Sequence, residues 1–112
     1  MQNNTDYLPN FNKQLHKHIY IADSCIHGKG LFAGSFIPEG TIIGWLQGSA
    51  SSVDGAYVLW LSDTRGIEVH GDLKYINHAD HPNACYYDDL SVVALRDIQA
   101  DEEITHNYAI IE

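Results

Sequence analysis

Residues 75–86 read YINHADHPNACY, in which an apolar start leads into a dense polar run. The run holds two histidines, two asparagines, a proline, a carboxylate and a cysteine, and this composition suits a metal site, a surface loop or the wall of a ligand pocket. In a loop, Asn77, Pro82 and Asn83 would form turns through local backbone hydrogen bonds. A plain loop does not explain why the apolar pair at 75–76 runs directly into these residues.

A metal site would use His78, His81 and Cys85, with Asp80 nearby. The His-x-x-His spacing fits one helix face poorly, and the sequence lacks the paired Cys-x-x-Cys or third histidine expected at zinc-finger distances. We therefore predict no bound metal and keep the metal-binding domain as a third hypothesis, behind the two described below.

The charge of the chain favours a cationic partner. Its 112 residues are enough for one domain, and 45% hydrophobic content is ordinary for a globular protein. Six Lys and Arg residues against fifteen Asp and Glu give a formal charge of −9. Such a surface repels phosphate backbones, so we expect no direct nucleic acid binding and favour a basic protein or peptide as partner. The alternative is that the charge serves only solubility.

Targeting and redox signals are absent from the sequence. No apolar window has the length of a membrane-spanning helix, and residues 1–14 lack the basic-then-apolar pattern of a signal peptide. This pattern predicts a cytoplasmic protein without membrane contact, with export to a host cell as the alternative. Cys25 and Cys85 are too few for a disulfide scaffold and are expected to be reduced thiols.

Short apolar runs begin at His18, after a polar lead-in over residues 1–17. Each run has about the length of a strand and is rich in Val, Ile, Tyr and Trp, and turn residues separate the runs. The runs are HIYIA, GLFAGSFIP, TIIGWLQG, YVLWL, IEVHG and SVVALRDI. Only residues 71–77 and the extreme N-terminus could hold short helices, since no 3.6-residue periodicity is sustained. The sequence therefore predicts a mostly β fold of many short strands.

Two further stretches could carry chemistry. The first, 28-GKGLFAG-34, does not fit a dinucleotide-binding fingerprint, but its glycines permit a ligand to approach the backbone. The second, 102-EEITHNY-108, ends in Tyr108. By default a tyrosine after a strand is a core or interface aromatic, and the functional interpretation places its hydroxyl in a pocket as a hydrogen-bond partner.

The order of these stretches is more specific than any one of them. G-x-G-L-F-A, I-P-E-G-T, Y-I-N-H-x-x-x-P-N and A-L-R-D-I-x-x-x-E-E-I-T-x-x-Y follow one another between about residues 19 and 108. This order resembles the SET-domain protein lysine methyltransferases, and the length is similar to the small viral and bacterial members. The resemblance implies a SET fold of several small, short-stranded sheets with a C-terminal pseudoknot. It implies a single SET domain over residues 18–112, without a cysteine-rich post-SET module.

The resemblance also implies methyl transfer from S-adenosylmethionine to a lysine side chain of a basic protein, histone-like or ribosomal. The cofactor would lie against the backbone of Lys29, Gly30 and Leu31. Asn77 would contact its methionine part and His78 its adenine, largely through backbone groups. Gly30 would be required because a side chain there could occlude the methionine moiety.

The resemblance assigns catalysis to Tyr108, whose hydroxyl would orient the substrate amine and the methyl group for in-line attack. Tyr57, Tyr86 and His106 lie near positions that line the substrate channel in relatives, although Tyr57 could equally be a core aromatic. His106 is an unusual occupant of its position, so no prediction of the number of methyl groups follows.

Several positions depart from the family pattern. The usual N-H-S-C-x-P-N reads N-H-A-D-H-P-N, Asn107 replaces an aspartate before Tyr108, and Lys74 stands where arginine is common. Only AIIE follows Tyr108, so a complete site would need a homodimer, ordering by substrate, or the lead-in. The second hypothesis is accordingly a catalytically inactive SET-like module that binds a peptide or the cofactor.

Overall fold

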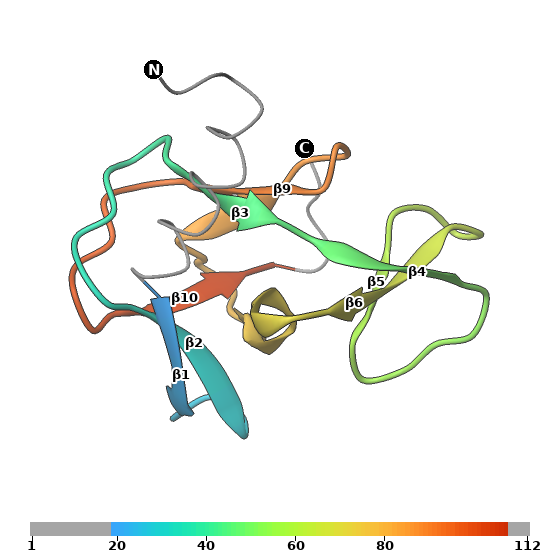
Figure 1. The fold of residues 1–112 in the computed structure, drawn as a ribbon, viewed down its shortest axis with the longest axis horizontal. Helices are drawn as coiled ribbons and strands as arrows, with labels where there is room; N and C mark the ends of the chain where they lie inside the picture. Colours follow the sequence, from blue (N-terminus) through green and yellow to red (C-terminus); the bar gives the residue numbers. More distant parts are fainter. Residues whose placement is uncertain (1–18, 108–112) are drawn as a thin grey trace, which may run out of the picture.

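The computed structural model describes residues 19–107, which form three small sheets and one short 3₁₀ helix (Figure 1). The elements are β1 (Ile19–Asp23), β2 (Lys29–Ala33), β3 (Ile42–Trp45), β4 (Gln47–Ser51), β5 (Val58–Trp60), β6 (Gly66–His70), η1 (Asp72–Tyr75), β7 (Asn77–His78), β8 (Ala84–Tyr86), β9 (Ser91–Ala94) and β10 (Glu103–His106). The lead-in over residues 1–17 and Tyr108 lie outside the described residues.

The mostly β fold predicted from the short apolar runs is confirmed, since each run contains a strand. The helix expected within 71–77 is the 3₁₀ helix η1, which spans four residues. No helix in the described range is therefore long and apolar enough to cross a membrane. The sequence did not reveal β8, which lies within the polar stretch and is buried along its whole length.

The sheets have the strand orders β1-β2-β10-β7, β3-β9-β8 and β4-β6-β5. The pairing of β10 with β7 is parallel, and the pairings of the other named strands are antiparallel. In Figure 1 the β4-β6-β5 sheet extends to one side of the other two. The first two sheets therefore enclose most of the core, and the third projects beside it.

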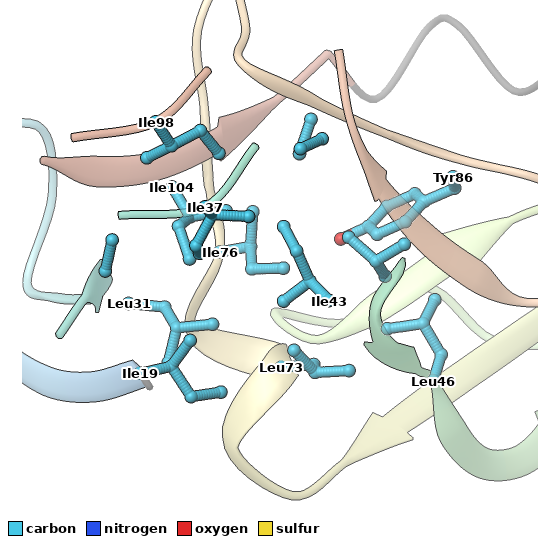
Figure 2. Close-up of a cluster of buried hydrophobic side chains, with 14 of the residues drawn as sticks. Ile19, Leu31, Ile37, Ile43, Leu46, Leu73, Ile76, Tyr86, Ile98 and Ile104 are labelled. Atoms are coloured by element: carbon cyan, nitrogen blue, oxygen red, sulfur yellow. The ribbon is translucent and has the colours of Figure 1, made fainter. Parts of the chain in front are cut away.

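Aliphatic side chains from the first two sheets and from the loops between them form the core (Figure 2). Leu31, Ile43, Ile98 and Ile104 are almost completely buried. Ile76 is also buried, at 1% exposure, which explains why an apolar pair precedes the polar run. Full burial of one such side chain contributes about 1.5–3 kcal/mol, so Ile76 anchors the polar stretch to the core.

Residues 77–83 hold the C-terminal strand β10 along one edge. The parallel register pairs Thr105 with Asn77, and the Ala79 N–H donates to the His106 carbonyl at 2.8 Å. The buried Asn83 side chain accepts from the Thr105 N–H at 2.8 Å and donates to the Glu103 carbonyl at 2.8 Å. On its other edge β10 pairs with β2. The asparagines of residues 75–86 thus hold a buried strand in place and are not turn residues of a free loop.

Asn83→Ala tests whether the Asn83 side chain holds β10 in place. It leaves the buried Thr105 N–H and the partly buried Glu103 carbonyl of β10 without their side-chain partner, and a buried group left unpaired costs about 1–3 kcal/mol. We expect urea unfolding to show a loss of roughly 2–5 kcal/mol. The matched control, Gln47→Ala on the exposed strand β4, should change stability by less than about 0.5 kcal/mol. Equal midpoints for both variants would show that the amide does not hold β10.

Candidate cofactor cleft

A cleft of about 170 Å³ lies where three separate segments of the chain meet. Its lining residues are His27, Gly28, Lys29, Ala56, Tyr57, Lys74, Tyr75 and Asn77. Two of the predicted cofactor residues, Lys29 and Asn77, therefore share one cavity with the predicted channel residue Tyr57. Gly30 and His78 are next to lining residues in the chain and Leu31 is one residue further away, and these three are not among the lining residues.

The Asn77 side chain holds the glycine loop in place. Its Nδ2 lies 3.0 Å from the His27 carbonyl, 3.1 Å from the Lys29 carbonyl and 2.9 Å from Glu103 Oε2. An amide nitrogen has only two hydrogens, so these three acceptors share them. The Asn77 amide nitrogen is thus committed to the protein, and a ligand at this position would meet mainly its carbonyl oxygen and the backbone.

Glu103 explains the requirement for glycine at position 30. A Cβ at Gly30 would collide with the Glu103 carboxylate and lie 3.0 Å from the Ser24 Cβ. Ser24 Oγ lies 2.9 Å from both carboxylate oxygens, which share its one hydrogen, and this contact holds Glu103 beneath the loop. The sequence suggested only that a side chain at Gly30 would obstruct a ligand. The neighbouring Leu31 is fully buried, so only its backbone can face a ligand.

Two tyrosines hold the Lys74 ammonium at the cleft. Lys74 Nζ lies 4.9 Å from the Tyr57 ring centroid and 5.2 Å from that of Tyr75, and the two rings meet edge to face at 6.0 Å. A cation over an aromatic face is attracted by the ring quadrupole. Sequence reasoning noted Lys74 only as a replacement for arginine and missed Tyr75. The signal available in the sequence was their position three and two residues before Asn77.

The other lysine of the cleft is already paired. Lys29 Nζ lies 2.7 Å from Asp23, and this contact raises the pKa of Lys29 and lowers that of Asp23. Both groups are exposed, so water screens the pair and it adds little stability. Lys74, in contrast, makes no ion pair with any carboxylate in the described range 19–107. It is the cation of this cleft that can meet an anionic group of a ligand.

A narrower pocket shares a wall with the cleft. The two cavities have Ala56, Tyr57 and Lys74 in common. The remaining lining of the second pocket is apolar or aromatic and consists of Val58, Leu59, Val69, Leu73 and Tyr86. Its volume is about 20 Å³, which is space for roughly one water molecule. The structure thus places Tyr57 at the boundary between the cavities and Tyr86 in the wall of the narrower one.

His106 lies behind Tyr86 and is completely buried. Its Nε2 is 3.3 Å from the Tyr86 hydroxyl, and the ring centroids are 4.3 Å apart. Burial, with a smaller contribution from nearby His78, lowers the pKa of His106 to about 3, while a hydrogen bond with the Ile76 backbone opposes the shift. A group with this pKa is a very weak base at neutral pH, so His106 is suited to position Tyr86 and not to accept a proton.

The metal-site residues do not converge. His78 Nε2 lies 3.6 Å from Asp80, while Cys85 is buried in β8. Among residues 19–107, no three His, Cys, Asp or Glu side chains form a group that could hold a metal ion. Cys25 is exposed, and neither Cys25 nor Cys85 forms a disulfide. The described residues therefore offer no support for the metal-binding hypothesis.

The fold and the cleft define a class of protein. The SET-domain sequence pattern matches residues 28–109, so this chain belongs to the SET-domain family. The chain is also similar in structure to a Plasmodium falciparum protein described as a "putative histone methyltransferase", with 25% identity and a TM-score of 0.65. That alignment covers 81% of this chain and 92% of the other. Comparison with curated protein sequences gives no match. The SET fold expected from the motifs is confirmed.

The buried His106 makes a pH-dependent contribution to stability. A histidine in the unfolded chain titrates near pH 6.5, whereas folded His106 titrates near 3, so below pH 6.5 the unfolded state binds a proton that the folded state does not. The contribution of His106 to the free energy of unfolding should therefore be fully present above pH 6.5. It should fall by roughly 2–3 kcal/mol on acidification to pH 4.5. Urea unfolding across this range should show the loss in the wild type and not in His106→Phe.

His81→Phe, a change of an exposed histidine in the same polar stretch, is the matched control. Its free energy of unfolding should depend on pH as that of the wild type does. If the free energy of unfolding of His106→Phe depends on pH as that of the wild type does, the buried imidazole is not the group that causes the pH dependence.

Proposed function

We propose that this SET-domain protein is an S-adenosylmethionine-dependent protein lysine methyltransferase. The observation that carries the proposal is the shared wall of Ala56, Tyr57 and Lys74 between the cleft and the narrower pocket. Methyl transfer requires a cofactor site and a substrate site that meet at one point, since the reacting atoms must approach to about 3–3.5 Å. The description of the Plasmodium falciparum relative as a histone methyltransferase supports the same class of activity.

The residues of the cleft fit the chemical groups of S-adenosylmethionine. The ammonium of Lys74 suits the carboxylate of the methionine part, because charge-assisted contacts of this kind are the strong ones. The ring faces of Tyr57 and Tyr75 hold that ammonium at the cleft. The backbone of Gly28 and Lys29 offers peptide groups at the same cleft. When bound, the cofactor supplies a methyl group activated on a positively charged sulfur.

The chain's own residues would prepare the substrate amine. The walls of the narrower pocket, including Leu59, Val69 and Leu73, exclude water and so disfavour the charged form of an entering lysine. Tyr86, held by His106, fixes one side of this pocket. By the family resemblance, the Tyr108 hydroxyl would orient the neutral amine toward the methyl group.

Entry of a lysine requires movement at the shared wall. A pocket of about 20 Å³ is too small for four methylenes and an amine. Tyr57 is 43% exposed and Lys74 is a long, flexible side chain, so these two can move without disturbing the core. If they do not move, the chain would be the second candidate, a SET-like module that binds cofactor or peptide without transferring a methyl group.

The proposed substrate is a basic protein, histone-like or ribosomal, because a chain with a formal charge of −9 attracts cationic partners. We place this activity in the cytoplasm, without nucleic acid or membrane as a direct partner, and a homodimer is one way to complete the site.

Methyl transfer tests the function, and Tyr108→Phe tests the catalytic role of Tyr108. Single-turnover reactions with labelled S-adenosylmethionine at saturation and a mixture of basic proteins should label lysines. Removing only the Tyr108 hydroxyl should slow the labelling by about 10²-fold, as misplaced reacting groups do. Tyr87→Phe, at an exposed tyrosine, is the matched control and should keep the wild-type rate.

Each negative outcome has its own meaning. Cofactor binding by calorimetry without any lysine labelling would favour the non-catalytic module. Labelling by Tyr108→Phe at the wild-type rate would instead leave the activity intact and contradict the assignment of Tyr108.

A further inference from the structure

The turn between β1 and β2, residues 24–28, forms one wall of the cofactor cleft through His27 and Gly28. Ser24 is half-buried, and the residues that follow it in the turn are exposed. A segment with exposed side chains gains little from packing, so its shape depends on its hydrogen bonds. Those bonds lead to one side chain of β10, the carboxylate of Glu103.

Ser24 folds the turn and links it to Glu103. The Ser24 Oγ accepts from the Ile26 N–H at 2.9 Å and from the His27 N–H at 3.3 Å, and the Ser24 N–H donates to the Gly28 carbonyl at 2.8 Å. A hydroxyl has two lone pairs and one hydrogen, and the turn uses both lone pairs. The hydrogen therefore goes to the Glu103 carboxylate, whose oxygens both lie 2.9 Å from Ser24 Oγ.

Asn77 approaches the same carboxylate from the other side. Its Nδ2 lies 2.9 Å from Glu103 Oε2 and also contacts the carbonyls of His27 and Lys29. A side-chain amide nitrogen can only donate. Ser24 and Asn77 thus both present hydrogens to Glu103, and a group that accepts at both oxygens is needed to satisfy them.

We propose that Glu103 is a positioning residue for the cofactor, whose carboxylate fixes the turn 24–28 against Asn77 in the shape that binds S-adenosylmethionine. The inference rests on the proposed function and adds to it a residue that does not line the cleft. Neither Glu103 nor the turn lines the narrower pocket. Glu103 therefore acts on cofactor affinity and not on the transfer step.

The same carboxylate fills the space beside Gly30. A Cβ at this position would collide with it. A carboxylate is the end of a flexible side chain, so Gly30→Ala should push it away from Ser24 and Asn77 while the backbone keeps its place. Glycine at position 30 is then required by Glu103 and not by a direct contact with the ligand.

Glu103→Gln tests the positioning because it keeps the size of the side chain and replaces one acceptor oxygen by a donor that faces Ser24 or Asn77. Calorimetry should show a Kd for S-adenosylmethionine about tenfold higher, as expected if the turn keeps its binding shape for only about a tenth of the time. At saturating cofactor, kcat should be unchanged, because only binding is affected.

Glu102→Gln is the matched control. Glu102 is the neighbouring carboxylate and pairs with Arg96 at 2.6 Å, away from the turn and the cleft. Its loss should lower stability and leave the Kd for the cofactor unchanged, which separates positioning from general destabilisation. Equal Kd values for Glu103→Gln and the wild type, or the same rise in Kd for Glu102→Gln, would overturn the proposal.

Hydrogen exchange of the cofactor-free protein gives a readout that does not depend on activity. The amides of Ser24, Ile26 and His27 should exchange faster in Glu103→Gln than in the wild type or in Glu102→Gln, because the turn is released. Unchanged exchange at these amides would overturn the hold of Glu103 on the turn. A wild type that binds no cofactor would instead contradict the proposed function, and with it the cofactor role of Glu103.

A double-mutant cycle tests the role of Gly30. Gly30→Ala alone should raise the Kd about as much as Glu103→Gln does. In a Glu103→Ala background it should have little further effect, because the added Cβ meets no carboxylate and residues in contact share one interaction. The same rise in Kd in both backgrounds would show that the ligand itself requires glycine there, and would overturn this part of the proposal.

Discussion

The pairing of β10 with β2 on one edge and β7 on the other is the constraint on which the rest of this molecule depends. Glu103 makes the side-chain hydrogen bonds that connect β10 to both neighbouring segments. The carbonyl of Glu103 accepts from Asn83, and its carboxylate accepts from Asn77 and Ser24. One residue of the C-terminal strand therefore joins the polar stretch 77–83 to the loop that precedes β2. Each of these contacts spans at least 20 residues of sequence, so they form only in the folded chain.

The shape of the cofactor cleft depends on this position of β10. Because Asn77 donates to the carbonyls of His27 and Lys29, the glycine loop lies against the end of η1, where Lys74 and Tyr75 project into the cleft. The loop bearing Tyr57 closes the third side and separates the cleft from the narrower pocket. The residues that hold the fold together are thus the neighbours of those that would hold the ligand, and a change at Asn77 should affect both.

The sequence predicted the strands because β-branched and aromatic runs separated by turn residues leave few alternatives. It also predicted the family, because four motifs occurred in order. It could not predict that Gly30 packs on Glu103, 73 positions away, because such a contact has no local pattern. Nor could it show that Lys74 lies between Tyr57 and Tyr75, or that His106 is buried and neutral. These features depend on the pairing of β10, which only the folded chain defines.

Hydrogen exchange of the full-length protein with and without saturating S-adenosylmethionine tests most directly whether the cleft next to β10 is the cofactor site. Protection should rise in the three segments that line the cleft, near residues 27–30, 55–58 and 73–78. It should stay unchanged around Phe36 and Ile43, where a separate cavity lies. Protection confined to residues 35–43, or no change in the three segments under conditions where calorimetry detects binding, would contradict the account.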